Sequence, residues 1–527
     1  ATGDEAERAA AEGERGLAER HGGDAGGFGS SSRGAGEEDY LGQKLARAVV
    51  DTNNVHHCAA TWHAPTVAGL VTTFGAGAMT NSIGEIRDAD FLFVTGSNTT
   101  EAHPVIGMEM KRAVRRGAKL YVADPRAIWL SRIADDHLQL NPGTDIWLLN
   151  AMAHVIIDEG LTDDAFIADH TTGFTRVEEA VRGYTPEEAE KVTGIPAESI
   201  RACARDYATT RRAGIFYTLG ITEHTHGTDN VYALANLVLM TGHLGVPSAG
   251  LNPLRGQNNV QGANDAGASP LYYPGYQRVD DPQTRDKFEA SWGTPLNAIP
   301  GLNLNEMMAD LAEGTIKGLF VMGEDIVMSD PNASRIQGGL QRCQFLVVQD
   351  IFQNETTAFA DVVFPAACFA EKDGVFTNSD RRVQRVRKAV EPPGEARADW
   401  QILCDVARAA GYPMPHYKDP AEIYAELSGL SPRFGGISHA RLEVEGGLQW
   451  PCPTSDHPGT GTLHGDGPLN GEAVFQPVSY RASAELPDEA YPLVLSTGRT
   501  LYHYNASTQT RRDAGPMVKQ PRNFVEM

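Results

Sequence analysis

One stretch of the sequence holds polar side chains at a density that a packed core would not select. Residues 252–265 contain one arginine, two glycines and seven amide or carboxylate side chains: Asn252, Gln257, Asn258, Asn259, Gln261, Asn264 and Asp265. Such a loop can offer many hydrogen-bond donors and acceptors to a large polar ligand, and the guanidinium of Arg255 can pair with a small anion. Taken alone, an Asn- and Gln-rich loop is also typical of a solvated turn.

Two further stretches combine residue types that can do chemistry. Residues 53–65 contain His63 directly after Trp62, and residues 496–503 contain Arg499 and His503. A histidine can accept or donate a proton near neutral pH. Taken singly, a histidine beside a tryptophan is more often packed in a core or lies on the surface.

The elements that must position these residues form a repeat. Residues 91–98 and 318–325 are each a short apolar run followed by a glycine and a polar side chain. In each copy a second apolar run then ends at an aspartate, Asp124 or Asp350, which lies 28 or 27 residues after the glycine. This spacing is typical of the buried parallel strands of βαβ units, whose carboxyl ends bind ligands. The repeat predicts two nucleotide-sized sites, or else two ordinary α/β layers whose strands end in turns.

Composition narrows the class of protein. The 527 residues are 41% hydrophobic and 21% charged, as in globular proteins, and no run of 18 apolar residues predicts a membrane span. A net charge of −23 argues against a nucleic-acid groove. The six cysteines form no CxxC pair, so we expect no zinc site or iron–sulfur cluster here, and a reducing, cytoplasmic location. Export to the periplasm stays open because the chain begins without a methionine.

The expected fold class is α/β, with two Rossmann-like blocks whose strand ends could each hold a nucleotide. We assign residues 58–257 to the first block, 1–57 and 258–411 to a discontinuous second block, 412–485 to an irregular linker and 486–527 to the start of an interrupted C-terminal domain. Strands are expected at 317–322, 344–349, 361–365 and 491–496, and helices near 37–50, 103–116, 145–158, 186–192 and 229–241.

Together the motifs resemble one family, the large subunit of molybdenum- or tungsten-dependent formate dehydrogenases in the molybdopterin oxidoreductase superfamily. The matching stretches follow the family's order over nearly the whole chain: 40–47, 63–70, 75–81, 124–126, 252–267, 348–352, 373–377 and 491–504. The resemblance implies a bis-(molybdopterin guanine dinucleotide) cofactor that holds one Mo or W. It also implies that the two blocks are dinucleotide-binding and that residues 486–527 are the start of a truncated, barrel-like cap domain. It also gives the repeat a purpose, since each half-sheet would hold one guanosine end.

The resemblance also implies a set of cofactor-binding residues. One dinucleotide would be held by Asn98, Asp124, Gly143 and Asp145. Other matching positions at the cofactor are Glu223, Gln257, Asp325, Ser329, Gln349 and Asp399. Arg499 and His503 match pterin or phosphate contacts in the cap domain. Glu223 stands where some members of the family have glutamine, and a negative charge there would be costly beside an anionic cofactor unless it were protonated or paired.

For the reaction, the resemblance assigns Arg255 to the formate carboxylate and His63 to a place beside the metal, where it would handle the proton. Formate would be oxidised to CO2. The family's N-terminal iron–sulfur module, with its [4Fe-4S] cluster and electron-transferring lysine, is not in this sequence. We expect that module on residues outside it, and electrons to pass to iron–sulfur, flavin or NAD-linked partner proteins.

The sequence departs from the family at the metal ligand. The residue before the histidine should be cysteine or selenocysteine, but Trp62 stands there, and an indole has no lone pair for a metal. Three explanations remain open: a UGA selenocysteine codon read as tryptophan, a divergent enzyme with other metal ligands, or an inactive chain. The alternative functions are therefore a molybdopterin oxidoreductase with another substrate, and a cofactor-binding remnant without turnover.

Overall fold

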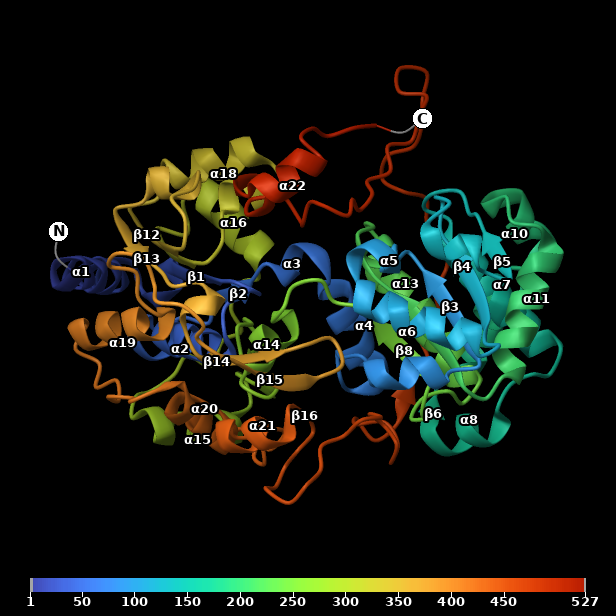
Figure 1. Ribbon diagram of the computed structural model, residues 1–527, viewed down its shortest axis with the longest axis horizontal. Coiled ribbons are helices and arrows are strands. Elements are labelled where there is room, and N and C mark those ends of the chain that lie inside the picture. Colours follow the sequence, from blue (N-terminus) through green and yellow to red (C-terminus); the bar gives the residue numbers. More distant parts are fainter. Residues whose placement is uncertain (1–2, 526–527) are drawn as a thin grey trace. The chain divides into compact units, whose positions relative to one another are not determined.

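The computed structural model describes residues 3–525, and its chain divides into two compact units (Figure 1). Unit 1 comprises Ala1–Thr61, Gln257–Thr460 and Asn505–Ala514, and unit 2 comprises Trp62–Gly256, Gly461–Tyr504 and Gly515–Met527. Residues 412–460 belong to unit 1. Within residues 3–525, no helix combines the length and apolar character needed to cross a bilayer.

Unit 2 is built on a five-stranded parallel sheet in the order β5-β4-β3-β7-β8. Its strands are β3 (Phe91–Thr95), β4 (Lys119–Ala123), β5 (Asp136–Leu138), β7 (Ala213–Tyr217) and β8 (Gly250–Pro253). Successive side chains of β3 enter different cores. Phe91 and Phe93 pack into one cluster with α4 (Ala64–Phe74), α7 (Asp145–Asp158), α11 (Ala197–Thr209) and α13 (Gly227–Met240). Leu92 and Val94 pack into another cluster with α6 (Pro104–Arg115). Burial on both faces explains why the strand is apolar throughout.

The helices of unit 2 lie around this sheet (Figure 1). Those near the candidate site are η3 (Ile83–Asp88), α4 (Ala64–Phe74), α5 (Thr99–Ala102), α6 (Pro104–Arg115), α12 (Leu219–Thr222) and α13 (Gly227–Met240). The others are η4 (Trp129–Arg132), α7 (Asp145–Asp158), α8 (Asp164–His170), α9 (Phe174–Val181), α10 (Pro186–Thr193) and α11 (Ala197–Thr209). The helices predicted near 103–116, 145–158, 186–192 and 229–241 are therefore confirmed.

Unit 1 has a second five-stranded parallel sheet, in the order β13-β12-β11-β1-β2. Its strands are β1 (Gly26–Ser30), β2 (Val55–His57), β11 (Gly318–Met322), β12 (Phe345–Asp350) and β13 (Val362–Pro365). The three strands predicted between 317 and 365 are confirmed. β1 and β2 were not predicted, because the sequence of β1, Gly-Gly-Phe-Gly-Ser, has the composition of a loop.

The two sheets share one strand order. β3, β4, β5, β7 and β8 of unit 2 correspond in position to β11, β12, β13, β1 and β2 of unit 1. In each sheet the order reverses beside its middle strand, between β3 and β7 or between β11 and β1. Open parallel sheets bind ligands outside the carboxyl ends of the strands at such a reversal. The parallel pairing of β3 with β4, and of β11 with β12, confirms the strand pairs expected from the repeat.

The remaining elements of unit 1 surround its sheet. The helices are α1 (Gly3–His21), η1 (Gly23–Ala25), α2 (Gly36–Leu45), a π-helical turn η2 (Ala46–Val50), α14 (Val260–Asp265), α15 (Pro282–Trp292), α16 (Leu304–Glu313), α17 (Ile326–Ser329), α18 (Ala333–Leu340), η5 (Thr356–Phe359), η6 (Phe369–Glu371), α19 (Asp399–Ala409), α20 (Pro420–Leu430) and α21 (His439–Glu445). The helix predicted over 37–50 is thus α2 continued by η2. Two small antiparallel sheets pair β9 (Tyr272–Tyr273) with β10 (Gln277–Arg278), and β14 (Gly374–Thr377) with β15 (Arg382–Val386) and β16 (Leu448–Gln449).

The C-terminal segment differs from expectation. The strand predicted at 491–496 is wrong, since these residues form no strand and expose Tyr491, Leu493 and Leu495. A strand needs a neighbour to take up its backbone hydrogen bonds, and no strand of the described chain pairs with this segment. The remaining short elements of the described chain are α3 (Ala59–Trp62), β6 (Thr171–Thr172), β17 (Ala473–Val474), η7 (Thr510–Arg512) and α22 (Ala514–Lys519).

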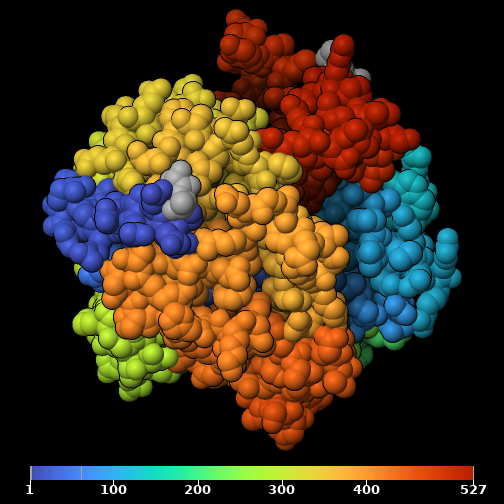
Figure 2. All heavy atoms as spheres, turned by 60° about the vertical axis from the view of Figure 1, so that its left-hand side comes forward, coloured from blue at the N-terminus to red at the C-terminus, as the bar shows by residue number. Residues whose placement is uncertain are grey.

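Helix α1 covers one face of unit 1 and buries a carboxyl group there. In Figure 2 this N-terminal helix (blue) lies against residues of the α19 region (orange), and Arg397 forms an ion pair with Glu7 across that contact. Glu14, on the inner side of α1, borders a small apolar cavity lined by Phe28, Val406 and their neighbours. One oxygen of its carboxyl group has no hydrogen-bond partner in the described chain. Burial raises the pKa of Glu14 from 4.5 to about 7.

We expect the stability of unit 1 to fall as the pH rises from 4.5 to 7, because the unfolded chain releases the Glu14 proton before the folded chain does. The loss from this group should be on the order of 3 kcal/mol. Glu14→Gln should remove that part of the pH dependence of the free energy of unfolding in urea. Glu12→Gln, on the exposed side of the same helix, should leave it unchanged.

Candidate active site

The two residues predicted to act on substrate lie at the carboxyl edge of the unit 2 sheet. His63 precedes α4 and Arg255 follows β8, and both side chains are buried, with 4% and 5% of their surface exposed. The guanidinium of Arg255 donates a hydrogen bond of 2.6 Å from Nη2 to the carbonyl oxygen of Gly77. The fold therefore holds a fixed cation inside unit 2.

A second histidine fixes the backbone of Arg255. His103 Nε2 lies 3.1 Å from the carbonyl oxygen of Arg255, so this nitrogen carries the hydrogen and donates it. Burial, with the charge of Arg499 as a smaller cause, lowers the pKa of His103 to about 4. His103 is thus neutral at pH 7. The sequence analysis did not select it, although it follows β3, at the strand edge where the other candidates were found.

Hydroxyl groups surround one side of the His63 ring. Nδ1 lies 3.1 Å from Thr66 Oγ1 and 3.3 Å from Thr222 Oγ1, and Thr66 Oγ1 lies 3.0 Å from the hydroxyl of Tyr217. All three partners are buried. Burial and the neighbouring Arg255 and His103 keep the pKa of His63 well below its usual 6.5, so the ring is neutral at pH 7. Sequence reasoning missed these three residues, because a threonine or tyrosine at a strand or helix end carries no distinctive signal.

Trp62 contributes its backbone rather than its side chain. It is the last residue of α3, and its carbonyl oxygen accepts a hydrogen bond of 2.9 Å from Thr222 Oγ1. Among the described residues, no group of three or more His, Cys, Asp or Glu side chains is placed to hold a metal ion. Cys58 lies four residues earlier in the sequence, and its thiol group is hydrogen-bonded to Ser32 and Gln257. Burial raises the pKa of this thiol to about 12.

The predicted nucleotide residues of unit 2 lie along the same sheet edge. After β3, Gly96 adopts a positive φ of 55°, and Asn98 begins α5 with its Oδ1 buried and without a hydrogen-bond partner in the described chain. After β4, Asp124 accepts a hydrogen bond from the backbone N–H of Arg126, and burial raises its pKa. The structure thus leaves a buried acceptor beside the sheet reversal, which suits a polar ligand.

The remaining candidates of unit 2 lie at helix starts or in loops. Gly143, with φ 80°, and Asp145 lead into α7, and burial raises the pKa of Asp145, which lies 3.9 Å from His224 Nε2. Glu223 follows α12; the residue is exposed, yet desolvation by the surrounding protein raises the pKa of its carboxyl group to about 7. Two further candidates lie in the C-terminal segment, where Arg499 stacks over the ring of Tyr504 at 4.8 Å and His503 Nε2 lies 2.7 Å from the carbonyl oxygen of Gln520.

In unit 1 the corresponding residues follow β11 and β12. Gly323 has a positive φ of 66°, as Gly96 has in unit 2, and Asp325 accepts hydrogen bonds from the backbone and hydroxyl of Thr356 at 3.2 and 2.7 Å. Ser329 donates to the carbonyl oxygen of Asp325. Gln257 donates to the sulfur of Cys58 at 3.3 Å. Each of these three side chains is therefore hydrogen-bonded to another residue of unit 1.

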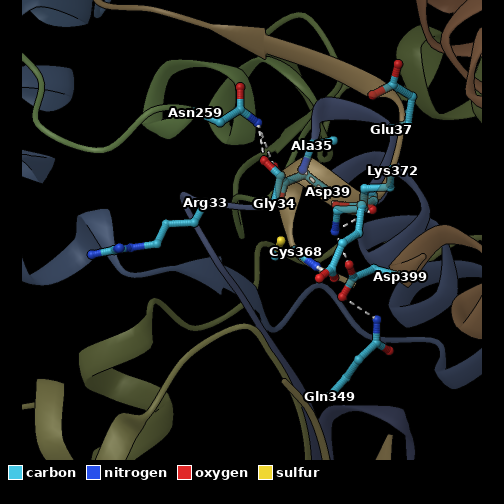
Figure 3. Close-up of polar contacts among 12 residues, drawn as sticks. Arg33, Gly34, Ala35, Glu37, Asp39, Asn259, Gln349, Cys368, Lys372 and Asp399 are labelled. Atoms are coloured by element: carbon cyan, nitrogen blue, oxygen red, sulfur yellow. Dashed lines mark hydrogen bonds and ion pairs between the residues drawn. The ribbon is translucent and has the colours of Figure 1, made fainter. Parts of the chain in front are cut away.

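Gln349 and Asp399 meet a buried lysine that sequence reasoning did not select. Figure 3 shows Gln349 and Lys372 both reaching Asp399, and Lys372 also pairs with Glu38. Burial favours neutral Lys372, but the charges of Asp399 and Glu38 outweigh it and raise the pKa of the lysine. Gln349 Nε2 donates to Asp399 Oδ1 at 2.7 Å, while its Oε1 is buried without a partner in the described residues. Only the tertiary structure joins these residues.

The adjoining residues of α2 are also buried and individually paired. Asp39 accepts hydrogen bonds from Ser30 and from Asn259, the second of which is visible in Figure 3. Glu37 accepts a hydrogen bond of 3.0 Å from the backbone of Val375. An acidic run at the start of a helix usually faces solvent, so its burial here could not be read from the sequence.

Lys372→Met should lower the free energy of unfolding by about 3–5 kcal/mol, because it leaves two buried carboxylates without their shared cation. Lys388→Met provides the matched control, since Lys388 pairs with the exposed Glu391. Its effect should stay below about 1 kcal/mol. Equal effects in urea unfolding would show that the buried pairs contribute no more than the surface pair.

The sequence is similar to known proteins over most of its length. Residues 4–409 match the family model described as molybdopterin oxidoreductase. The F420-dependent formate dehydrogenase subunit alpha of Methanocaldococcus jannaschii is 46% identical over 504 residues, which cover 95% of this chain and 74% of that protein. Formate dehydrogenase H of Escherichia coli is 44% identical over 501 residues, 94% of this chain and 70% of that protein.

A solved structure shares the fold. The acetylene hydratase from Pelobacter acetylenicus has a TM-score of 0.66 and 21% sequence identity, and the match covers 85% of this chain. This chain spans 63% of the length of that protein. The likeness supports a mixed α/β architecture with parallel sheets.

Proposed function

This chain belongs to the molybdopterin oxidoreductase family, and we propose that it is the catalytic subunit of a formate dehydrogenase. The observation that carries the proposal is the pair of buried residues at one sheet edge, the cation Arg255 and the neutral His63, in a chain so similar to formate dehydrogenases. Formate is a small anion that yields CO2, one proton and two electrons. An oxidoreductase needs a cofactor to take the two electrons.

Besides a cofactor, this reaction needs a group that binds the formate carboxylate and a group that accepts the proton, and the chain offers one side chain for each. The planar guanidinium of Arg255 can pair with the formate carboxylate, and its bond to Gly77 holds it in place. His63 is neutral, so it can accept the proton that formate loses. Burial of both residues keeps water from competing for the carboxylate and strengthens the attraction to the cation.

The expected cofactor is a bis-(molybdopterin guanine dinucleotide) with Mo or W, which supplies the redox chemistry when bound. The strand-edge residues fit such a group, because both sheets carry a strand-end glycine at positive φ and a buried amide oxygen, of Asn98 or Gln349, that has no partner among the described residues. We propose two Rossmann-like binding blocks on this basis. The residues that would hold the cofactor are Asn98, Asp124, Gly143, Asp145, Glu223, Gln257, Asp325, Ser329, Gln349, Asp399, Arg499 and His503.

Glu223 fits this set in its protonated form. With a pKa of about 7, its carboxyl group carries a proton in a large fraction of molecules at neutral pH. A protonated carboxyl group donates a hydrogen bond, as the glutamine of other family members does. Electrons would leave through an iron–sulfur module, outside this sequence, to partner subunits, and residues 486–527 would begin a barrel-like cap domain. The six scattered cysteines support a reducing, cytoplasmic location.

Trp62 supports a second candidate, a cofactor-binding protein without turnover, because its side chain does not bind a metal. The test is formate-dependent reduction of a viologen dye, with Mo and W content measured on the same sample. Dye reduction with bound metal is the result expected for the product of the native gene. Bound metal without formate activity would indicate another substrate. Bound pterin with no metal and no formate activity would indicate the second candidate.

A further inference from the structure

The ring of His63 has two different environments. Its Nδ1 contacts the hydroxyls of Thr66 and Thr222, while its Nε2 is buried and has no hydrogen-bond partner among the described residues. A neutral imidazole carries its hydrogen on one nitrogen and a lone pair on the other. The nitrogen that carries the lone pair is the one able to accept a proton. The partners of Nδ1 therefore decide which nitrogen can act as a base.

The hydroxyl of Thr222 identifies the hydrogen's position. Thr222 Oγ1 lies 2.9 Å from the carbonyl oxygen of Trp62, and a carbonyl oxygen only accepts. The single hydroxyl hydrogen of Thr222 is therefore used in that bond. The 3.3 Å contact between Thr222 Oγ1 and His63 Nδ1 is then a hydrogen bond only if the ring supplies the hydrogen. With the hydrogen on Nε2, two lone pairs would face each other at this contact.

The second threonine agrees with this assignment. Thr66 Oγ1 can accept from Nδ1 and use its own hydrogen, or that of Tyr217, for the 3.0 Å contact between their hydroxyls. Tyr217 is the last residue of β7, and α12, which ends at Thr222, follows this strand closely. The strand and the helix thus place the hydroxyls of Tyr217 and Thr222 beside Thr66 and His63 at the start of α4. The side chains come from elements that pack around one sheet edge. The tautomer is thus built into the fold of unit 2.

We propose that Thr222, supported by Thr66, is a positioning residue that holds His63 as the Nδ1–H tautomer, with the Nε2 lone pair free to accept the proton released in oxidation. The catalytic part of this inference rests on the proposed function, whereas the tautomer does not. The acceptor for Thr222 is the main-chain carbonyl of residue 62. The arrangement is therefore the same whether tryptophan, cysteine or selenocysteine stands at that position.

The direct test is ¹⁵N NMR of the full chain labelled with [¹⁵N]histidine at pH 7, in which protonated and bare ring nitrogens have well-separated shifts. The His63 signals are identified by their loss in His63→Gln. We expect the wild-type ring and that of Thr222→Ser to carry the hydrogen on Nδ1. In Thr222→Val the Nε2–H form should gain population, because Thr66 can then donate to Nδ1. A wild-type ring with its hydrogen on Nε2 would overturn the proposal, whatever the variants do.

Kinetics of the cofactor-loaded enzyme give the second readout. Thr222→Val should lower kcat at least roughly 10-fold with little change in the KM for formate, since a general base contributes about 100-fold or more. Thr222→Ser should restore the rate, because it keeps the hydroxyl. Thr73→Val is the matched control: Thr73 is a buried threonine of α4, the helix that carries Thr66, and its hydroxyl donates to Gly69 instead. An equal loss in Thr73→Val would mean that packing, not the tautomer, sets the rate. The expected tautomer without formate turnover would count against the proposed function alone.

Discussion

Arg255→Lys is expected to lower kcat/KM for formate roughly 100-fold, in protein that has a metal ligand at position 62 (the product of the native gene, or Trp62→Cys), while the content of pterin and metal stays that of its parent. An ammonium group keeps the positive charge but does not present the planar, two-pronged donor set that matches a carboxylate. It would also lose the geometry of the 2.6 Å bond to the carbonyl oxygen of Gly77. The measurement is formate-dependent dye reduction, with both cofactor components quantified on the same preparation.

Arg212→Lys is the matched control for this substitution. Arg212 also belongs to unit 2 and pairs with Asp90 through two hydrogen bonds of 2.7 Å, but the pair is exposed to solvent. Its replacement should leave formate oxidation unchanged. Normal turnover in Arg255→Lys would remove Arg255 from the substrate site, and loss of cofactor in that variant would assign it a structural role instead.

The second large effect concerns position 62. Translated with tryptophan at position 62, the chain should oxidise formate only at background. Trp62→Cys should raise this to readily measurable turnover, because a thiolate can bind the metal and an indole does not. Trp62 is only half-buried and its backbone is held by Thr222, so the smaller side chain should be accommodated without a change of fold. Dye reduction and the metal content per chain are the measurements. In the gene we expect UGA, the selenocysteine codon, at this position.

Two variants serve as controls for the gain of activity in Trp62→Cys. Trp129→Cys replaces an exposed tryptophan of the same unit and should bring no activity. Cys58→Ser, combined with Trp62→Cys, should not reduce the gain, because the Cys58 thiol is held protonated by burial. A UGG codon together with an inactive Trp62→Cys variant would favour the cofactor-binding protein without turnover.

The sequence by itself determined the repeated half of the fold. The apolar runs that became β3, β4, β11 and β12 are buried on both faces, so their composition alone marks them as parallel strands. Helix α7 matches its predicted bounds because its apolar pattern is long and uninterrupted. The motifs around His63 and Arg255 were also sufficient to identify the family.

The tertiary structure decided which residues meet. Gly-rich β1 becomes an interior strand only because β11 and β2 pair with it on either side. Residues 491–496 stay without strand structure because no strand of the described chain pairs with them. Lys372 joins Glu38 across 334 positions of sequence, and Thr222 reaches His63 across 159. Such contacts depend on the path of the whole chain, and the hydroxyls and charges involved have no periodic pattern along it. Local sequence therefore predicts the strands, while burial and long-range contact assign each polar side chain its partner.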